Sequence, residues 1–544
     1  MERHRVEARA DFSIVDWFRA SAARFPARPA LCLAGRPESY AELDAAVQQL
    51  AGAITLHDPD PTLPLCGVFG QRSRTAYLGL LAALAAGKGY VPLHPRYPGA
   101  RTAYMLVRSG VRVLVVGSDA TEAARSALEQ ADDGLVVLLP DEAGPASWTR
   151  GLEKHRFLCA PEIAAAPPLG ARPPVPEDAL AYLLFTSGTT GTPKGVGVTH
   201  ANVRSYVEAS LEVYRPDERD RFSQHPDLTF DVSVHDLWLC WASGASLHPV
   251  PVRALMSPAR FIRERELTFW GSVPSVIAFL RGLGQLAPGS LPTLRCSTFC
   301  GEPLPAEAAS VWQRAAPGSE IHNLYGPTEA TIAVTRYRWR GEASERESRN
   351  GVVPIGEPLR GTSFAIVEPE GDASRETEMG ELVVYGAQVA PGYWRDPAQT
   401  LRRFVRHPKT GASGYRTGDL VRYQDGPGLL YLGRIDEQLK VRGHRVETAE
   451  VEQALRRAGG CELAAVIGWP RTLSGADGLV AFVSGGSLDE GELLRCCRDL
   501  LPDYMVPSEV RRLSRFPLNV NGKIDRGALR ALLESAAEGR DGDE

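Results

Sequence analysis

The sequence contains no hydrophobic run long enough to cross a bilayer. A membrane-spanning helix needs about 20 consecutive apolar residues, and no stretch of this 544-residue chain approaches that length. The first residues, MERHRVEARADF, are polar and hold no apolar signal-peptide core. Both absences argue against a membrane protein and against secretion, so we expect a cytoplasmic protein.

A strong net charge is also lacking. Lys and Arg number 61 and Asp and Glu number 66, which leaves a formal net charge of −5 over the whole chain. Proteins that bind nucleic acid or anionic membranes through bulk charge carry a marked excess of basic residues. We therefore predict neither a nucleic-acid partner nor a membrane partner.

Cysteine is scarce and irregularly spaced. The nine cysteines are an odd number, Cys296 and Cys300 are too far apart for a C-x-x-C pair, and no Cys/His spacing typical of a metal site occurs. The sequence thus argues against a disulfide scaffold and a structural zinc site, and favours reduced thiols.

Strands and helices alternate along the chain, whose length favours two to four domains. Apolar runs at 65–69, 113–116 and 135–139 are typical of strands, and an Ala/Leu-rich helix is expected between the first two. This alternation predicts parallel sheets with crossover helices. Residues 141–177 are rich in Pro, Gly and Ala, and we interpret them as a connector.

One stretch joins a strand to a loop suited to phosphate. Residues 179–200 read ALAYLLFTSGTTGTPKGVGVTH, an apolar run followed by small and hydroxyl residues. The loop offers backbone N–H groups, hydroxyls and the mobile charge of Lys194, which a polyphosphate needs. It is not the common P-loop, since Pro193 precedes that lysine and Gly195 follows it. By composition alone, a flexible surface turn is the simpler interpretation.

Three acidic residues stand in patterns that suit ligand binding. Asp231 lies among apolar residues, where burial is costly unless a cation pairs with it. A Gly-Pro turn holds Tyr325 and Glu329 on either side, and these suit adenine stacking and Mg²⁺ respectively. Asp419 follows a glycine and can accept hydrogen bonds from both ribose hydroxyls. Taken singly, a cap aspartate, a packing tyrosine and a solvated turn are the alternatives.

The motif TSGTTGTPKG resembles the phosphate-binding loop of the adenylate-forming superfamily, which includes acyl-CoA synthetases, luciferases and the adenylation domains of nonribosomal peptide synthetases. Further stretches resemble the family's motifs in the same order: SYAEL, AAGKGYVPLHP, FDVSV, HNLYGPTE, YRTGDL, GRIDEQLKVRGHRVETAEVE and NGKIDR. GELVVYGAQVAPGYW also resembles a family motif but has Pro391 where arginine is usual, and we assign it no chemistry. The resemblance covers residues 11–533.

This resemblance implies an α/β fold with two domains. A large N-terminal domain, residues 1–432, would hold parallel sheets, crossover helices, and the ATP and amino-acid site. A small mobile α+β domain, residues 433–533, would follow on a hinge at Asp436 and carry the catalytic lysine, Lys523. In it, the loop 440–443 would serve the second half-reaction. Residues 534–544 would form an acidic tail, which we expect to be disordered.

The resemblance also assigns the ligand-binding residues. Lys523 and Lys194 would act in catalysis, and Glu329 would hold Mg²⁺ on the phosphates of ATP. The residues assigned to the nucleotide are Thr186, Ser187, Gly188, Thr189, Thr190, Gly191, Asn323, Tyr325, Gly326, Thr328, Asp419 and Arg434.

Asp231 would pair with the α-ammonium of an amino acid. The side-chain pocket would be formed by Val232, His235, Gly271, Thr298, Cys300, Leu324, Ile332 and Ala333. Most of these are apolar, and only His235 could carry a charge. Since an unpaired charge is prohibitive to bury, this set predicts a small-to-medium neutral α-amino acid that is aliphatic, cyclic or hydroxylated.

The implied activity is ATP-dependent formation of an aminoacyl-AMP, followed by transfer to the phosphopantetheine thiol of a carrier protein. The chain ends 21 residues after Lys523 and lacks an HHxxxDG motif, so we expect a freestanding enzyme that loads a separate carrier. An acyl- or aryl-CoA ligase is one alternative, against which Asp231 argues. A catalytically inactive binding protein is the other; against it argue four intact residues, Lys194, Glu329, Asp419 and Lys523. The amino acid, the carrier, the oligomeric state and any need for a small activator protein stay open.

Overall fold

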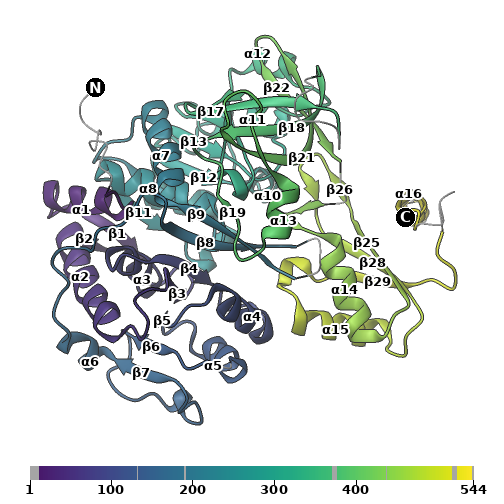
Figure 1. Ribbon diagram of the computed structural model, residues 1–544. Coiled ribbons are helices and arrows are strands. Elements are labelled where there is room, and N and C mark those ends of the chain that lie inside the picture. Colours follow the sequence, from purple (N-terminus) through teal and green to yellow (C-terminus); the bar gives the residue numbers. More distant parts are fainter. Residues whose placement is uncertain are drawn as a thin grey trace.

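The computed structural model describes residues 11–131, 133–188, 192–369, 377–435, 438–517 and 524–541. Figure 1 shows a large body built from most of the chain and a smaller unit formed by its last part, where α14, α15 and strands β25, β28 and β29 lie together. This arrangement confirms the predicted fold class, a large α/β part followed by a small α+β part. Across the described ranges, none of the helices combines the length and apolarity needed to traverse a bilayer.

The first large sheet has eight described strands in the order β19-β9-β8-β4-β3-β5-β6-β7, parallel from β8 to β7. Crossover helices connect its parallel strands, as the alternating pattern predicts. The strands are β3 (Leu65–Phe69), β4 (Gly89–Leu93), β5 (Val113–Val116), β6 (Val136–Leu139), β7 (Arg156–Cys159), β8 (Leu180–Thr186), β9 (Lys194–Thr199) and β19 (Gly392–Tyr393), and the helices are α3 (Arg74–Ala85), α4 (Gly99–Ser109), α5 (Thr121–Gln130) and α6 (Ala160–Ala165).

The second large sheet has nine described strands in the order β16-β15-β14-β13-β12-β10-β11-β1-β2. Its six central strands are parallel, and the other three are antiparallel to their neighbours. The strands are β1 (Pro29–Leu33), β2 (Arg36–Ser39), β10 (Arg221–Gln224), β11 (Ser246–Pro249), β12 (Phe269–Ser272), β13 (Cys296–Phe299), β14 (Glu320–Tyr325), β15 (Thr335–Arg338) and β16 (Glu357–Pro358). The accompanying helices are α1 (Val15–Arg24), α2 (Tyr40–His57), α7 (His200–Tyr214), α8 (Val232–Ser243), α9 (Pro258–Glu264), α10 (Ser275–Gly282), α11 (Ala306–Ala315) and α12 (Glu342–Glu347).

The main core contains residues of both large sheets together with α2, α3 and α8. Every residue of α3 from Thr75 to Ala85 is buried, and α8 contributes Trp238 and Trp241, which are fully buried. Helices that are apolar on all sides are typical of a buried layer between sheets. This shared core fixes α8, at whose N-terminus Asp231 lies, relative to both sheets.

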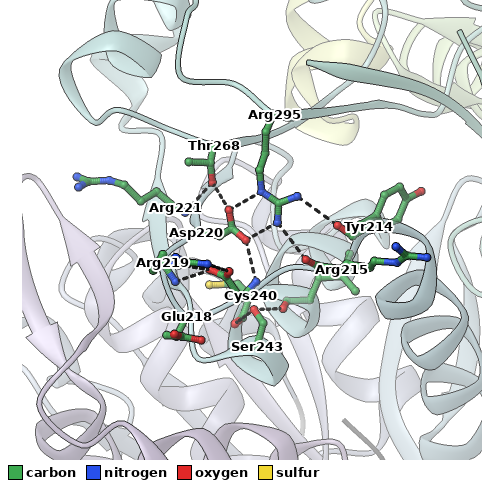
Figure 2. A network of polar contacts seen from close by, with 12 residues as sticks. Tyr214, Arg215, Glu218, Arg219, Asp220, Arg221, Cys240, Ser243, Thr268 and Arg295 are labelled. Atoms are coloured by element: carbon green, nitrogen blue, oxygen red, sulfur yellow. Dashed lines mark hydrogen bonds and ion pairs between the residues drawn. The ribbon is translucent and has the colours of Figure 1, made fainter. Parts of the chain in front are cut away.

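An ion pair between the buried Asp220 and the half-buried Arg295 connects the amino ends of neighbouring strands of the second sheet (Figure 2). The Asp220 carboxylate accepts hydrogen bonds from Arg295 Nε (2.7 Å) and the Thr268 hydroxyl (2.8 Å). Arg295 also donates to the carbonyl oxygens of Tyr214 and Arg215 at the end of α7. These contacts join the starts of β10, β12 and β13 and so hold the three strands in register. Ligands bind at the opposite, carboxyl ends of the strands in sheets of this kind.

A smaller antiparallel sheet completes the large part, with strands β17 (Thr362–Val367), β18 (Met379–Gly386), β20 (Phe404–Arg406), β21 (Ser413–Gln424) and β22 (Gly428–Arg434), and with α13 (Pro397–Arg403) beside it. β22 pairs with β21 through Arg434, two residues beyond the boundary predicted after residue 432. That boundary stays a prediction, and the predicted hinge, Asp436, lies outside the described residues.

In the small part, the described residues form two sheets, three α-helices and a short 3-10 helix at Asp503–Met505. Its elements are β23 (Leu439–Val441), β24 (His444–Val446), α14 (Thr448–Gly459), β25 (Leu463–Gly468), β26 (Arg471–Thr472), β27 (Gly475–Ala476), β28 (Leu479–Ser484), α15 (Glu490–Leu500), β29 (Glu509–Arg512) and α16 (Arg526–Asp541). β23 and β24 form a hairpin with Lys440 opposite Arg445.

Two local predictions were wrong. The predicted connector 141–177 contains β7, which extends the first sheet, and α6. The tail predicted to be disordered after residue 533 is helical through Asp541. The tail continues α16, whose residues 528–541 read ALRALLESAAEGRD and are mostly strong helix formers, so local propensity outweighs the acidic composition near the end.

Candidate active site

One cavity of about 450 Å³ is lined by residues of both the large and the small part. Its walls include residues after the carboxyl ends of β8, β10, β13 and β14, and residues of the β23–β24 hairpin. Sites in sheets of this kind form where the strands end. The predicted nucleotide and amino-acid residues that line it are Thr186, Ser187, Asn323, Tyr325, Gly326, Thr328, Asp419, Arg434, Asp231, Val232, Cys300, Leu324 and Ile332.

The predicted phosphate loop joins β8 to β9. A Cβ on Gly188 would lie 2.0 Å from the Thr192 carbonyl oxygen, so only glycine fits this turn. The Ser187 hydroxyl donates to the Arg445 carbonyl oxygen (2.9 Å), and the Gly188 N–H donates to Glu450 Oε2 (3.3 Å). Groups predicted to bind phosphate are thus bonded to the small part. Thr189, Thr190 and Gly191 lie outside the described residues, as does Lys523.

Glu329 stands at the centre of a buried charged cluster. Its Oε1 accepts a hydrogen bond from the Tyr393 hydroxyl (2.8 Å) and lies 3.3 Å from Lys194 Nζ, while its Oε2 lies 3.0 Å from Arg445 Nη1. Lys194 also donates to the Tyr393 hydroxyl (3.1 Å). Burial alone would raise the pKa of Glu329, but the Arg445 guanidinium and the Lys194 ammonium hold that pKa well below its usual range.

The same buried cluster also changes the pKa of Lys194. Burial lowers the pKa of Lys194 to about 8, an effect to which the neighbouring Arg445 adds and which Glu329 opposes. This lysine is therefore easier to deprotonate than a surface lysine, and a polyanion beside it would favour its charged form.

In this arrangement the residues do not fit Mg²⁺ at Glu329. Mg²⁺ takes oxygen ligands, yet both carboxylate oxygens here face cationic nitrogens of Lys194 and Arg445. No group of three or more His, Cys, Asp or Glu side chains is placed to hold a metal ion in the part of the chain that the structure describes. A dication at this carboxylate would require that Arg445, which belongs to the small part, lie elsewhere.

The predicted ribose ligand, Asp419, lies inside β21, where Gly418 has a positive φ of 73°. The Tyr325 hydroxyl donates to Asp419 Oδ2, and Arg434 Nη1 donates to Oδ1 at 2.8 Å. Residues more than 90 positions apart thus form one polar group on the cavity wall. Asn323 lies nearby, and its side-chain amide donates to the Pro354 carbonyl oxygen (2.9 Å).

Asp231 is the predicted partner of the substrate ammonium. It precedes α8, is 9% exposed, and lines the cavity. Burial raises its pKa to about 6, while the Thr328 hydroxyl and the charge of Lys440 act in the opposite direction. A buried carboxylate whose ionised form is disfavoured mainly by burial suits an incoming cation, which would stabilise that form.

Half of the predicted side-chain pocket lies outside the cavity wall. Val232, Cys300, Leu324 and Ile332 line the cavity, whereas His235, Gly271, Thr298 and Ala333 are buried behind it. The prediction that Gly271 opens one wall was wrong, because the carboxyl group of Asp236 fills that space.

Sequence reasoning missed three residues of the site: Tyr393, Arg445 and Glu450. Tyr393 belongs to the stretch GELVVYGAQVAPGYW, to which we assigned no chemistry, and its hydroxyl lies between Lys194 and Glu329. Arg445 and Glu450 lie in the stretch GRIDEQLKVRGHRVETAEVE, whose resemblance to a family motif was the available signal, but we assigned these two residues no role. Glu450 also pairs with Arg101 of α4, and both side chains are buried.

Comparison with known proteins matches most of the chain. A family model described as AMP-binding enzyme matches residues 18–394, and one described as AMP-binding enzyme C-terminal domain matches residues 450–523. Tyrocidine synthase 1 of Brevibacillus parabrevis is 32% identical over 524 residues, which are 95% of this chain and 45% of that protein. The chain spans less than half the length of the curated relatives it matches.

Two solved structures share the fold over nearly the whole chain. The Vibrio cholerae adenylation domain AlmE, in complex with glycyl-adenosine-5'-phosphate, matches with a TM-score of 0.86 and 30% identity, covering 98% of this chain and 99% of that one. Holo-PA1221, an NRPS protein containing adenylation and PCP domains, matches with a TM-score of 0.77 and 26% identity, covering 96% and 84%. The chain therefore belongs to the AMP-binding enzyme family, as an adenylate-forming ligase of the nonribosomal peptide synthetase adenylation type.

Proposed function

We propose that this chain uses ATP to convert a small-to-medium neutral α-amino acid into an aminoacyl-AMP and then loads the phosphopantetheine thiol of a separate carrier protein. The observation that carries this proposal is Asp231, a buried acid in the same cavity as the Tyr325–Asp419–Arg434 group. One end of the cavity thus suits an ammonium and the other a ribose. Because the reaction consumes ATP, the proposal includes a cytoplasmic location.

In the first step, a carboxylate oxygen of the amino acid attacks the α-phosphorus of ATP, and the bond to the pyrophosphate oxygen breaks. No covalent enzyme intermediate is needed, so position and charge carry the catalysis. Asp231 would hold the ammonium, Asp419 the ribose, and Lys194 with the phosphate loop the departing pyrophosphate. Lys523 would neutralise the charge that develops on the α-phosphoryl group. We propose that Glu329 binds Mg²⁺ only in an arrangement in which Arg445 no longer contacts its carboxylate.

In the second step, the carrier thiol attacks the adenylate carbonyl, the carbon–oxygen bond to AMP breaks, and the thiol proton is lost. Contacts between the parts support a separate arrangement for this step: Arg445 lies at Glu329, and Glu450 bonds to the phosphate loop. In this arrangement the Gly188 N–H is bonded to Glu450 and is not offered to pyrophosphate. Holo-PA1221, which contains both an adenylation and a PCP domain, is a precedent for the carrier partner.

The test is amino-acid-dependent exchange of labelled pyrophosphate into ATP. Exchange that requires an α-amino acid supports the proposal; exchange with an acid lacking the amine favours a CoA-type ligase, and none favours an inactive protein. Lys523→Ala is expected to lower exchange by roughly 100- to 1,000-fold, the usual loss when one transition-state donor is removed. An unchanged melting temperature is the control for folding. Near wild-type exchange in the variant would contradict the role of Lys523.

The raised pKa of Asp231 predicts a pH dependence for amino-acid binding. Only the ionised carboxylate can pair with the ammonium, so binding is strong above about pH 6 and is lost as the pH falls through that value. We expect kcat/KM for the amino acid to fall roughly tenfold per pH unit below the inflection, which reports the free enzyme. Asp231→Asn is expected to abolish the inflection in its residual rate. A profile that keeps the inflection in this variant would assign it to another group.

A further inference from the structure

Half of the eight residues predicted to surround the amino-acid side chain are absent from the cavity lining that the structure describes. The four that line the cavity are Val232, Cys300, Leu324 and Ile332. Three of these side chains are branched hydrocarbons. Cys300 is 3% exposed, and burial raises the pKa of its thiol to about 12, so it carries no charge at neutral pH. This wall therefore offers apolar contact to a substrate and no ionic partner.

Asp236 closes the space in front of Gly271. A Cβ built on Gly271 would lie 2.7 Å from Asp236 Oδ1 and 3.3 Å from Thr298 Oγ1. Asp236 is 2% exposed, and its Oδ2 has no hydrogen-bond partner among the residues that the structure describes. Burial raises the pKa of this carboxyl well above its usual range, so the group fills the space as a neutral acid. The missing side chain of Gly271 thus makes room for Asp236.

His235 is held away from the cavity on another side. Its Nδ1 lies 2.7 Å from the Tyr206 hydroxyl, and its ring packs edge-on against Tyr214, with centroids 5.6 Å apart. Both tyrosines belong to α7. Burial lowers the pKa of His235 to about 3, so the ring is neutral and provides no counter-charge for an acidic substrate.

We infer that the substrate is an α-amino acid whose side chain is no larger than that of serine or cysteine, which leaves glycine, alanine, serine and cysteine. This inference rests on the proposed function and narrows its substrate class. A longer side chain would have to displace Asp236, Thr298 or the branched wall residues from a packed interior. Extra methylene groups in such a packed site are destabilising, and discrimination of one methylene in an apolar pocket is of order 10- to 200-fold.

The test compares kcat/KM for pyrophosphate exchange with glycine, alanine, serine and cysteine against valine, leucine, proline and phenylalanine. The best small amino acid is expected to exceed each larger one by at least about tenfold. A preference for a branched, cyclic or aromatic amino acid would overturn the inference and leave the proposed function standing. Absence of exchange with every amino acid, together with exchange for an acid lacking the amine, would overturn both.

Asp236→Ala is expected to shift the preference toward valine or leucine by at least about tenfold relative to alanine, because the space in front of Gly271 is then open. Ser243→Ala is the matched control: it lies on the same helix, its hydroxyl bonds only within α8, and it should keep the wild-type ranking. Leu324→Ala enlarges the pocket from a different wall and should produce a similar shift. If the folded Asp236→Ala and Leu324→Ala proteins both keep the wild-type ranking, Asp236 and Leu324 do not limit the size of the substrate side chain, and the inference is wrong.

Discussion

Replacing Asp231 by alanine is expected to lower kcat/KM for the amino acid by two to three orders of magnitude. The carboxylate is 9% exposed at the start of α8, and Lys440 is the cation whose charge acts on it. Without it, the substrate ammonium would be buried near Lys440 with no counter-charge. Loss of one partner from a buried ion pair costs roughly 3–5 kcal/mol, and 1.4 kcal/mol corresponds to about tenfold.

Amino-acid-dependent pyrophosphate exchange, measured over a range of amino-acid concentrations, provides the readout. Asp231→Asn keeps the shape and removes the charge, so it should lose nearly as much as the alanine variant. Binding of ATP, measured by calorimetry, should be unchanged in both, since Asp419 and Tyr325 are untouched. An apparent affinity for the amino acid equal to that of the wild type would rule out Asp231 as its counter-charge.

The sequence predicted the parts of the site that are carried by short, contiguous motifs. The strand before the phosphate loop, the turn at Gly326 and the ribose candidate Asp419 were each found from local patterns. The resemblance then indicated that these distant segments share one site, and the structure brings Tyr325, Asp419 and Arg434 into contact. Regular strands were also predicted closely: β3 and β5 have the predicted bounds.

Contacts between the two parts could not be predicted in this way. Arg445 and Glu329 lie 116 residues apart, and only the position of the β23–β24 hairpin brings them together. Asp236 illustrates the same limit on a smaller scale. A buried acid inside an apolar helix would usually be expected to have a polar partner. The Asp236 carboxyl instead fills space left by the missing side chain of Gly271, which lies on a strand later in the chain.

Replacing Glu329 by glutamine is expected to release the β23–β24 hairpin from the large part. The carboxylate is fully buried and lies 3.0 Å from Arg445 and 3.3 Å from Lys194. In the variant Arg445 keeps the more distant carboxylate of Glu447, whose Oε1 lies 3.9 Å from Arg445 Nη2, but it loses Glu329, and loss of one partner from a buried pair typically costs roughly 3–5 kcal/mol. Movement of the hairpin would relieve the repulsion between Arg445 and Lys194, against the remaining contacts of Glu450 with Arg101 and Gly188.

Hydrogen exchange of the ligand-free, full-length protein measures this release, and we expect amides of residues 439–446 to exchange at least about tenfold faster in Glu329→Gln. Glu381→Gln is the matched control, because Glu381 forms a buried ion pair with Arg416 entirely within the β18–β21 pair. It should lower the free energy of unfolding without changing exchange in the hairpin. The double variant Glu329→Gln/Arg445→Gln should be more resistant to denaturant than Glu329→Gln alone, since the buried guanidinium that has lost Glu329 is gone. Hairpin exchange in Glu329→Gln that matches the wild type would show that the Glu329–Arg445 pair does not hold the two parts together.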